Sequence, residues 1–150
     1  MNKIKKILSF ILTCTMLMGM STTAFASEML NVSTEAPTEA NISRGLGRPN
    51  EDNCVNLTEE ELDFAGEATH STLYTNSYFT GKSSVDYSIT NYYDRTLTVK
   101  IYSMSNPFIC VDKIEVDAND TATGTISGLK ADKKYYLTFS GPSHFTGTLK

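Results

Sequence analysis

Apolar and polar residues alternate with a period of two from His70 to the C-terminus, and turn-forming residues interrupt the alternation at intervals of about 8 to 12 residues. The alternation is clearest in two triplets, Val85, Tyr87, Ile89 and Leu97, Val99, Ile101. Successive side chains of a β-strand point to opposite faces, so each triplet is expected to face a core from one side of a strand. Short strands separated in this way are typical of a sandwich or a barrel, and we predict an all-β fold.

The turn residues divide this region into about seven strands. The predicted strands are Leu73–Phe79, Val85–Ile89, Leu97–Ile101, Phe108–Val116, Thr121–Ile126, Tyr135–Phe139 and Phe145–Leu149. We predict that the sandwich domain, with one short helix at its start, covers residues 57–150. A domain of this size has a small core, so every large apolar side chain is needed to stabilise it.

The short helix is predicted immediately before the first strand. Thr58 and Glu61 have the spacing of a capping box, and Leu57 and Leu62 occupy the two positions of a hydrophobic staple. We expect about two helical turns over Thr58–Ala65, docked against the sandwich by the apolar side chains.

The N-terminus has the three parts of a secretory signal peptide. A basic stretch is followed by an apolar run and by small residues: Lys3 to Lys6, Ile7 to Met18, and Ala24 to Ala26. We predict a signal peptide over residues 1–26, cut after Ala26, and therefore a secreted, extracellular protein. A retained signal anchor is the alternative, but a bilayer span needs about 20 apolar residues. Lipidation at Cys14 is disfavoured because Thr13 precedes it, where lipoprotein signals carry a smaller residue.

Acidic residues are concentrated in the stretch that follows the leader. Removal of the leader takes away three lysines and moves the net charge from −4 to −7. Segment 27–56 has no apolar run to offset its ordering entropy, so it is predicted to be a disordered acidic arm. Because phosphate neutralisation supplies most nucleic-acid affinity, this acidic chain is not expected to bind nucleic acid. Stable membrane insertion after signal cleavage is not expected either.

One stretch of the sandwich region resembles a known family. In Ile126–Phe139, Leu129 follows a glycine and precedes Tyr135 by six residues, after which the alternation resumes. This stretch resembles the E-to-F crossing of fibronectin type III domains, and Tyr135–Lys150 is similar to the bacterial pre-peptidase C-terminal domain. Both resemblances imply a small immunoglobulin/fibronectin-like β-sandwich with no catalytic residue. The first implies that Tyr135 is a corner tyrosine bonded to backbone upstream, with Leu129 beneath it. Two residues depart from the fibronectin pattern, Ala131 in place of proline and Ile89 in place of tryptophan.

Two cysteines remain after signal cleavage. Cysteine pairs in exported proteins are usually oxidised, so we predict a disulfide between Cys54 and Cys110. It would close a loop of about 57 residues and contribute about 4 kcal/mol in the chain-entropy model. In the alternative, Cys110 is a free thiol that packs as a small hydrophobe within the apolar run Phe108–Val111.

Catalytic chemistry has little support. The only histidines are His70 and His144, and no serine is flanked by the glycines of a nucleophile elbow. No zinc-ligand spacing is present. Residues Asp117–Asp120 offer oxygen ligands but lack the pattern of a calcium loop, and a tight turn is the favoured interpretation. We therefore expect no catalytic residue, no metal and no cofactor.

Binding is better supported, because the aromatic residues are too numerous for one small core. The residues in question are Tyr74, Tyr78, Phe79, Tyr92, Tyr93, Tyr102 and Tyr136. Tyr92 and Tyr93 stand in a predicted turn, where exposed tyrosines provide contact area at low entropic cost. They are the predicted ligand-binding residues of a secreted, non-enzymatic binding or accessory module for an extracellular protein or glycan. The alternatives are a processed effector of the toxin or bacteriocin kind, with Ser27–Asn53 as a removable pro-segment, and a small hydrolase that uses His70 or His144.

Overall fold

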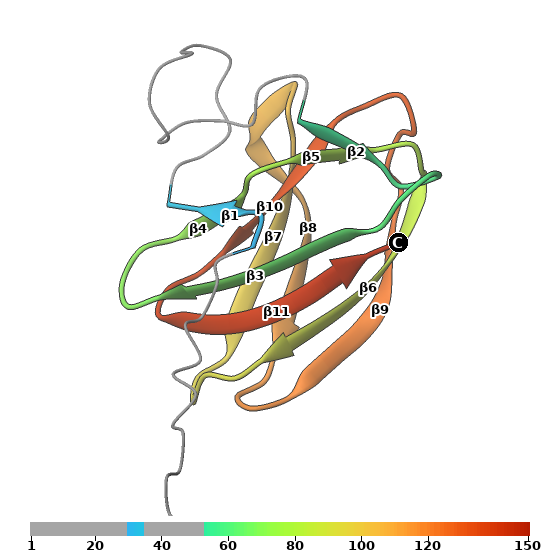
Figure 1. Cartoon of the computed structure of the whole chain (residues 1–150). Helices are drawn as coiled ribbons and strands as arrows, with labels where there is room; N and C mark the ends of the chain where they lie inside the picture. The colour runs from blue at the N-terminus through green and yellow to red at the C-terminus, as the bar shows by residue number, and fades with distance from the viewer. Residues whose placement is uncertain (1–29, 35–52) are drawn as a thin grey trace, which may run out of the picture.

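A computed structural model of the chain describes residues 30–34 and 53–150. These residues form eleven strands in two sheets and contain no helix, which confirms the all-β prediction (Figure 1). Nothing in the described ranges is a helix long and apolar enough to cross a membrane. The predicted signal peptide, residues 1–26, lies outside the described residues.

The larger sheet has seven strands. In chain order they are β1 (Val32–Ser33), β2 (Cys54–Asn56), β4 (Leu73–Thr75), β5 (Tyr78–Thr80), β7 (Leu97–Ser103), β8 (Asn106–Val116) and β10 (Tyr135–Phe139). Strand β10 is central: β7 pairs with one of its edges, and β4 and β5 pair with successive parts of the other. Strand β8 lies beyond β7, β1 beyond β4, and β2 runs parallel beside β5.

The smaller sheet has four strands. They are β3 (Leu62–Ala68), β6 (Ser84–Asn91), β9 (Thr121–Ser127) and β11 (Ser143–Leu149), in the spatial order β3-β11-β6-β9. All its pairings are antiparallel. Figure 1 shows β3, β11 and β6 crossing in front of β7 and β8 of the larger sheet.

The two sheets share one apolar core. Phe139 of β10 stacks on Phe145 of β11 with ring centroids 4.1 Å apart, and the Phe64 ring of β3 lies 5.2 Å from Phe139. All three rings are buried. Aromatic pairs contribute about 0.5 to 1.5 kcal/mol beyond the area they bury, so this cluster is a main contact between the sheets. The arrangement is β-sandwich-like.

Six of the predicted strands are present as single strands, and one is divided. The prediction of one strand over Leu73–Phe79 is wrong, because β4 and β5 are separated by a bend at Asn76 and Ser77. The side chain of Asn76 donates to the carbonyl of Val32 at 3.2 Å, and its backbone N–H donates to the carbonyl of Asn31. The interruption is therefore held by a segment that lies far away in the sequence.

The predicted helix over Thr58–Ala65 is wrong. Residues Leu62–Ala68 form β3, and all seven of them pair with β11. The side chain of Asn56, and not that of Thr58, holds the preceding turn by accepting the Thr58 N–H at 3.2 Å. A two-turn helix is marginal without tertiary support, whereas β3 gains a full ladder and buries Leu62 and Phe64. Leu57 and Leu62, the residues expected to form the hydrophobic staple of the helix, are instead part of the core.

Two short segments of the predicted disordered arm are strands, which corrects its boundaries. In 30–34, β1 pairs with β4, and Leu30 exchanges two backbone hydrogen bonds with Ala65 of β3 at 2.9 and 2.8 Å. This segment therefore contacts both sheets, and Val32 is buried. Cys54–Asn56 forms β2 against β5. Residues 35–52 lie outside the described part of the chain.

The contact expected of Tyr135 is present. The backbone N–H of Lys130 donates to the Tyr135 hydroxyl at 2.9 Å, and Leu129 is buried nearby in the same core. Gly128, with φ of 78°, provides the left-handed backbone conformation at the turn that leads into Leu129. This bond ties the β9–β10 connection to the first residue of β10.

Candidate ligand-binding groove

Strand alternation gives the larger sheet a second, outward-facing surface. On β7, Leu97, Val99 and Ile101 are buried in the core, so the residues between them face outward. On β10, Tyr135, Leu137 and Phe139 are in the core, and Tyr136 and Thr138 occupy the outward positions, where neighbouring side chains cover them to 4% and 8% exposure. The outward residues of β4, β7 and β10 lie side by side because the strands are paired in register.

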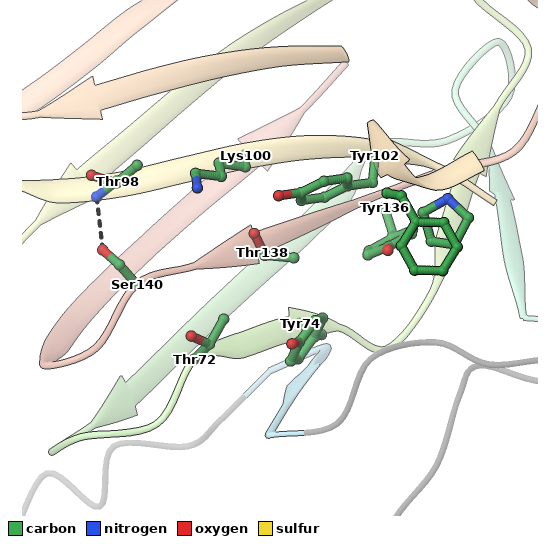
Figure 2. A pocket seen from close by; sticks show the side chains of 10 residues that line it. Thr72, Tyr74, Thr98, Lys100, Tyr102, Tyr136, Thr138 and Ser140 are labelled. Carbon is green, nitrogen blue, oxygen red and sulfur yellow. Dashed lines mark hydrogen bonds between the residues drawn. The ribbon is translucent and has the colours of Figure 1, made fainter. Parts of the chain in front are cut away.

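These residues line an open groove of about 670 Å³. Its apolar part consists of Tyr74, Tyr102, Pro107, Phe108 and Tyr136, and its polar part of Thr72, Thr98, Lys100, Thr138 and Ser140. Figure 2 shows tyrosines from three strands near one end and hydroxyl-bearing side chains toward the other. The groove is thus amphipathic along its length.

The tyrosines form a packed aromatic group. Tyr102 and Tyr136 are directly opposite each other in the β7–β10 register, with centroids 5.6 Å apart and rings inclined by 23°. The Tyr74 ring lies 6.5 Å from Tyr136, and the Tyr78 ring meets Tyr136 edge-on at 6.1 Å. Each ring is held by its neighbours, so a ligand that packs on this group orders few side chains.

An irregularity in β8 adds Phe108 to the groove. The β7–β8 register shifts twice, so that Tyr102 pairs with Cys110 and Ser103 with Asn106. The residues between Asn106 and Cys110 have no partner in this register. Phe108 is 93% exposed although it lines the groove. Bulges often redirect side chains in this way, and here the bulge adds an apolar ring to the groove that Tyr102 and Tyr136 also line.

The opposite end of the groove is rich in hydroxyl groups. Ser140 and Thr98 are joined by two hydrogen bonds: the Thr98 N–H donates to the Ser140 Oγ at 3.0 Å, and the Ser140 N–H donates to the Thr98 carbonyl at 3.0 Å (Figure 2). Thr72 and Thr138 add two more hydroxyls. Lys100 is the one charged residue among those described as lining the groove.

The predicted binding residues Tyr92 and Tyr93 are not part of this groove. The Tyr92 ring lies 5.2 Å from the His144 ring, and its hydroxyl is 3.3 Å from the Thr146 Oγ, so Tyr92 lies over β11 of the smaller sheet. Tyr93 lines a smaller depression of about 370 Å³. Buried Asn91 holds the loop by accepting the Tyr93 N–H at 3.0 Å and donating to the Arg95 carbonyl at 2.7 Å.

The two histidines are in different surroundings. His70 and Ser143 both line the smaller depression, where the Ser143 hydroxyl is buried without a hydrogen-bond partner. His144 is half-buried in β11 beside the ring of Tyr92. The described residues contain no group of three side chains that could hold a metal ion. Asp117–Asp120 forms a turn, in which Asp120 accepts the Thr121 N–H at 2.7 Å.

The predicted Cys54–Cys110 disulfide is not present in the structure, where both thiols are free. Cys54 is in β2 and Cys110 in β8, with β5, β10 and β7 between them. At about 4.8 Å per strand the two cysteines are several times farther apart than a disulfide allows. Burial raises the pKa of the Cys54 thiol, and the charge of Lys134 partly offsets this effect. The Cys110 thiol donates to the Asp112 carbonyl at 2.9 Å.

The sequence indicates a surplus of tyrosines, but the two it favours for binding, Tyr92 and Tyr93, lie outside this groove. The usable signal was the outward position of Tyr102 and Tyr136 in strands that were predicted correctly. What the pattern could not show is that β7 and β10 are neighbours. No protein-family model, curated protein or solved structure matches this chain.

Proposed function

We propose that this protein is a secreted, non-enzymatic binding module that holds an extended polysaccharide in the groove of the larger sheet. The observation that carries the proposal is the aromatic group of Tyr74, Tyr102 and Tyr136 beside a row of hydroxyl groups. A sugar ring has an apolar face of C–H groups and a rim of hydroxyls. Tyrosine offers an apolar ring with a polar edge, so it matches both parts of a sugar.

The shape of the groove favours a polymer over a compact ligand. It is open, and its lining residues run from Tyr136 on β10 to Ser140 just beyond the end of that strand. Four steps along a strand cover about 13 Å, which is room for more than one sugar ring. One ring stacks on the half-buried Tyr74 and Tyr102 while the next meets the hydroxyls of Thr72 and Thr98. A glycan is therefore favoured over a protein partner, whose interface would be larger and more continuously apolar at its centre.

Binding without catalysis fits the residues of the groove. Glycoside hydrolysis generally uses a pair of carboxylates on either side of the scissile bond. The described lining residues include no aspartate or glutamate. The histidines required by the hydrolase alternative, His70 and His144, do not line this groove. An adhesive or accessory role follows from this composition.

Export and the immunoglobulin-like class belong to the same proposal. Export is supported by the leader in residues 1–26 and by the extracellular location of most polysaccharides. The immunoglobulin-like class is supported by the hydrogen bond between Lys130 and the Tyr135 hydroxyl, which is the contact of a tyrosine corner.

The proposal is tested with the chain that starts at Ser27. Affinity electrophoresis in gels that contain single soluble polysaccharides measures retardation of the wild type and of Tyr102→Ala and Tyr74→Ala. We expect at least one polysaccharide to retard the wild type, and each variant to bind it about tenfold more weakly, which corresponds to about 1.4 kcal/mol. Thermal unfolding of each variant checks that the fold is retained.

The matched control is Tyr92→Ala combined with Tyr93→Ala, which removes two tyrosines outside the groove. This double variant is expected to bind like the wild type. Retention of full binding by the folded groove variants, or loss of binding in the control alone, would refute the proposal. Secreted material that begins beyond Arg44 would favour the processed effector instead.

A further inference from the structure

We infer that the polysaccharide is acidic and that one of its carboxylates binds Lys100. This inference rests on the proposed polysaccharide-binding function and specifies its ligand. Lys100 is exposed and occupies the middle outward position of β7, between Thr98 and Tyr102. In the β7–β10 register it lies opposite Thr138, so its ammonium group is near the centre of the groove (Figure 2).

The charge of Lys100 is not matched by the protein. No described ion pair includes it, and the described lining residues contain no carboxylate. A neutral polymer laid over this side chain would displace water from the ammonium group without replacing its hydrogen bonds. A sugar carboxylate replaces them with charge-assisted hydrogen bonds, which are stronger than neutral ones. A ligand with a negative charge is therefore favoured at this position.

Lys113, the lysine next to Lys100 on β8, differs from Lys100 because it is paired within the protein. Lys113 of β8 is directly opposite Lys100 in the antiparallel register, and its Nζ is 2.8 Å from a carboxylate oxygen of Glu115. This hydrogen bond raises the pKa of Lys113 and lowers the pKa of Glu115. One of two adjacent lysines is thus paired within the protein and the other faces the ligand. Two like charges directly across a strand pair repel each other, and a bound anion relieves that repulsion.

The larger sheet has acidic side chains on β8, Asp112 and Glu115, of which Glu115 is paired with Lys113, and the smaller sheet carries others. Asp86 accepts a hydrogen bond from the Thr125 hydroxyl at 2.6 Å, and Asp63 accepts one from Thr148, both on strands of the smaller sheet. Asp63 also lines the shallow depression there. An acidic polymer is consequently repelled from the smaller sheet and finds its unpaired cation in the groove of the larger one. Charge complementarity at Lys100 therefore favours an anionic ligand in the groove.

The experiment compares acidic polymers with their own neutralised forms. The probes are polygalacturonate, alginate and hyaluronate, each with its carboxyl methyl ester, titrated calorimetrically into the chain that starts at Ser27. The backbone and stereochemistry of each pair are the same, so the difference reports the carboxylate. We expect at least one acid form to bind about tenfold more tightly than its ester, and the preference to disappear at about 1 M salt, where screening is effective over about 3 Å.

Charge variants of Lys100, Glu115 and Lys113 locate the effect. Lys100→Gln is expected to remove the preference for the acid form, and Lys100→Arg is expected to keep the preference. Glu115→Gln releases Lys113 and is expected to strengthen binding of the acid form. Lys100 and Glu115 are exposed, so these substitutions leave the core intact.

The outcomes separate this inference from the proposed function. Equal binding of acid and ester by the wild type, with both lost in Tyr102→Ala, would overturn the inference and leave polysaccharide binding standing. A preference that survives Lys100→Gln and disappears in Lys113→Gln would overturn the assignment to Lys100. If no member of these pairs binds while a neutral polysaccharide does, the acidic ligand is refuted. If no polysaccharide of either kind binds, the proposed function fails and the inference fails with it.

Discussion

Replacement of Tyr135 by phenylalanine isolates the single hydrogen bond that closes the β9–β10 connection. The substitution removes the hydroxyl that accepts the Lys130 N–H at 2.9 Å. It retains the ring, which is almost completely buried and lies 5.8 Å from Phe79. Any change in stability therefore reports the bond and not the packing of the side chain.

The expected loss is about 1 kcal/mol. A typical intramolecular hydrogen bond contributes about 0.5 to 1.5 kcal/mol net, and a fully buried donor left without a partner would cost about 1 to 3 kcal/mol. Lys130 is exposed, so water can reach its N–H after the substitution and the loss stays near the lower figure. For a domain of this size 1 kcal/mol lowers the Tm by about 4 to 8 °C.

Urea unfolding followed by circular dichroism measures the change, with an unchanged slope required for a valid comparison. The matched control is Tyr74→Phe, which removes a hydroxyl from a half-buried tyrosine in the groove and is expected to change stability by less than about 0.5 kcal/mol. If Tyr135→Phe is as stable as the wild type, the corner bond does not hold the connection. A loss above about 3 kcal/mol would mean that the ring repacks and that the reasoning from one bond is wrong.

Two further predictions concern the thiols and the core. Alkylation of the unreduced, denatured protein is expected to label both Cys54 and Cys110. In the native protein Cys110 is expected to react first, because it is exposed and because burial raises the pKa of Cys54 and lowers its thiolate fraction at neutral pH. Protection of both thiols in the denatured protein would show that the disulfide forms. Gly147→Ala is expected to cost about 1 to 3 kcal/mol in urea unfolding, since the added methyl carbon would lie 2.5 Å from the buried Phe64 ring and 3.0 Å from the Ser88 carbonyl. The exposed neighbour Thr146→Ala is expected to change stability by less than about 0.5 kcal/mol, and equal effects of the two substitutions would contradict this view of the core.

The failed helix shows where local sequence rules are overridden. Thr58, Glu61 and the two flanking leucines satisfy the rules for a capped helix. The same residues also fit a strand, because Leu62 and Phe64 are two apart and alternate with Asp63. The choice between the two depends on whether an unpaired strand edge is available. That edge is provided by β11, about 80 residues later in the chain.

In the groove, too, some features follow from the local sequence pattern and others only from long-range strand pairing. The alternation in β7 and β10 predicts which tyrosines face outward, since it depends only on the period of a strand. Their assembly into one surface depends on the β4-β10-β7 order, which is a matter of long-range pairing. The exposure of Phe108 depends on a register shift in β8 that has no counterpart in the apolar pattern of Phe108–Val111.

The sequence by itself determined the all-β class, the positions of six strands and the inward-facing triplets of β6 and β7, because these depend on the alternation along each strand. The tertiary structure alone decided that Leu62–Ala68 is a strand, that Cys54 and Cys110 are on well-separated strands, and that three tyrosines and Lys100 share a groove. Strand order and register are set by hydrogen bonds and packing between segments far apart in the chain. Alternative strand pairings compete across the whole fold, so a local sequence pattern does not predict which of them forms.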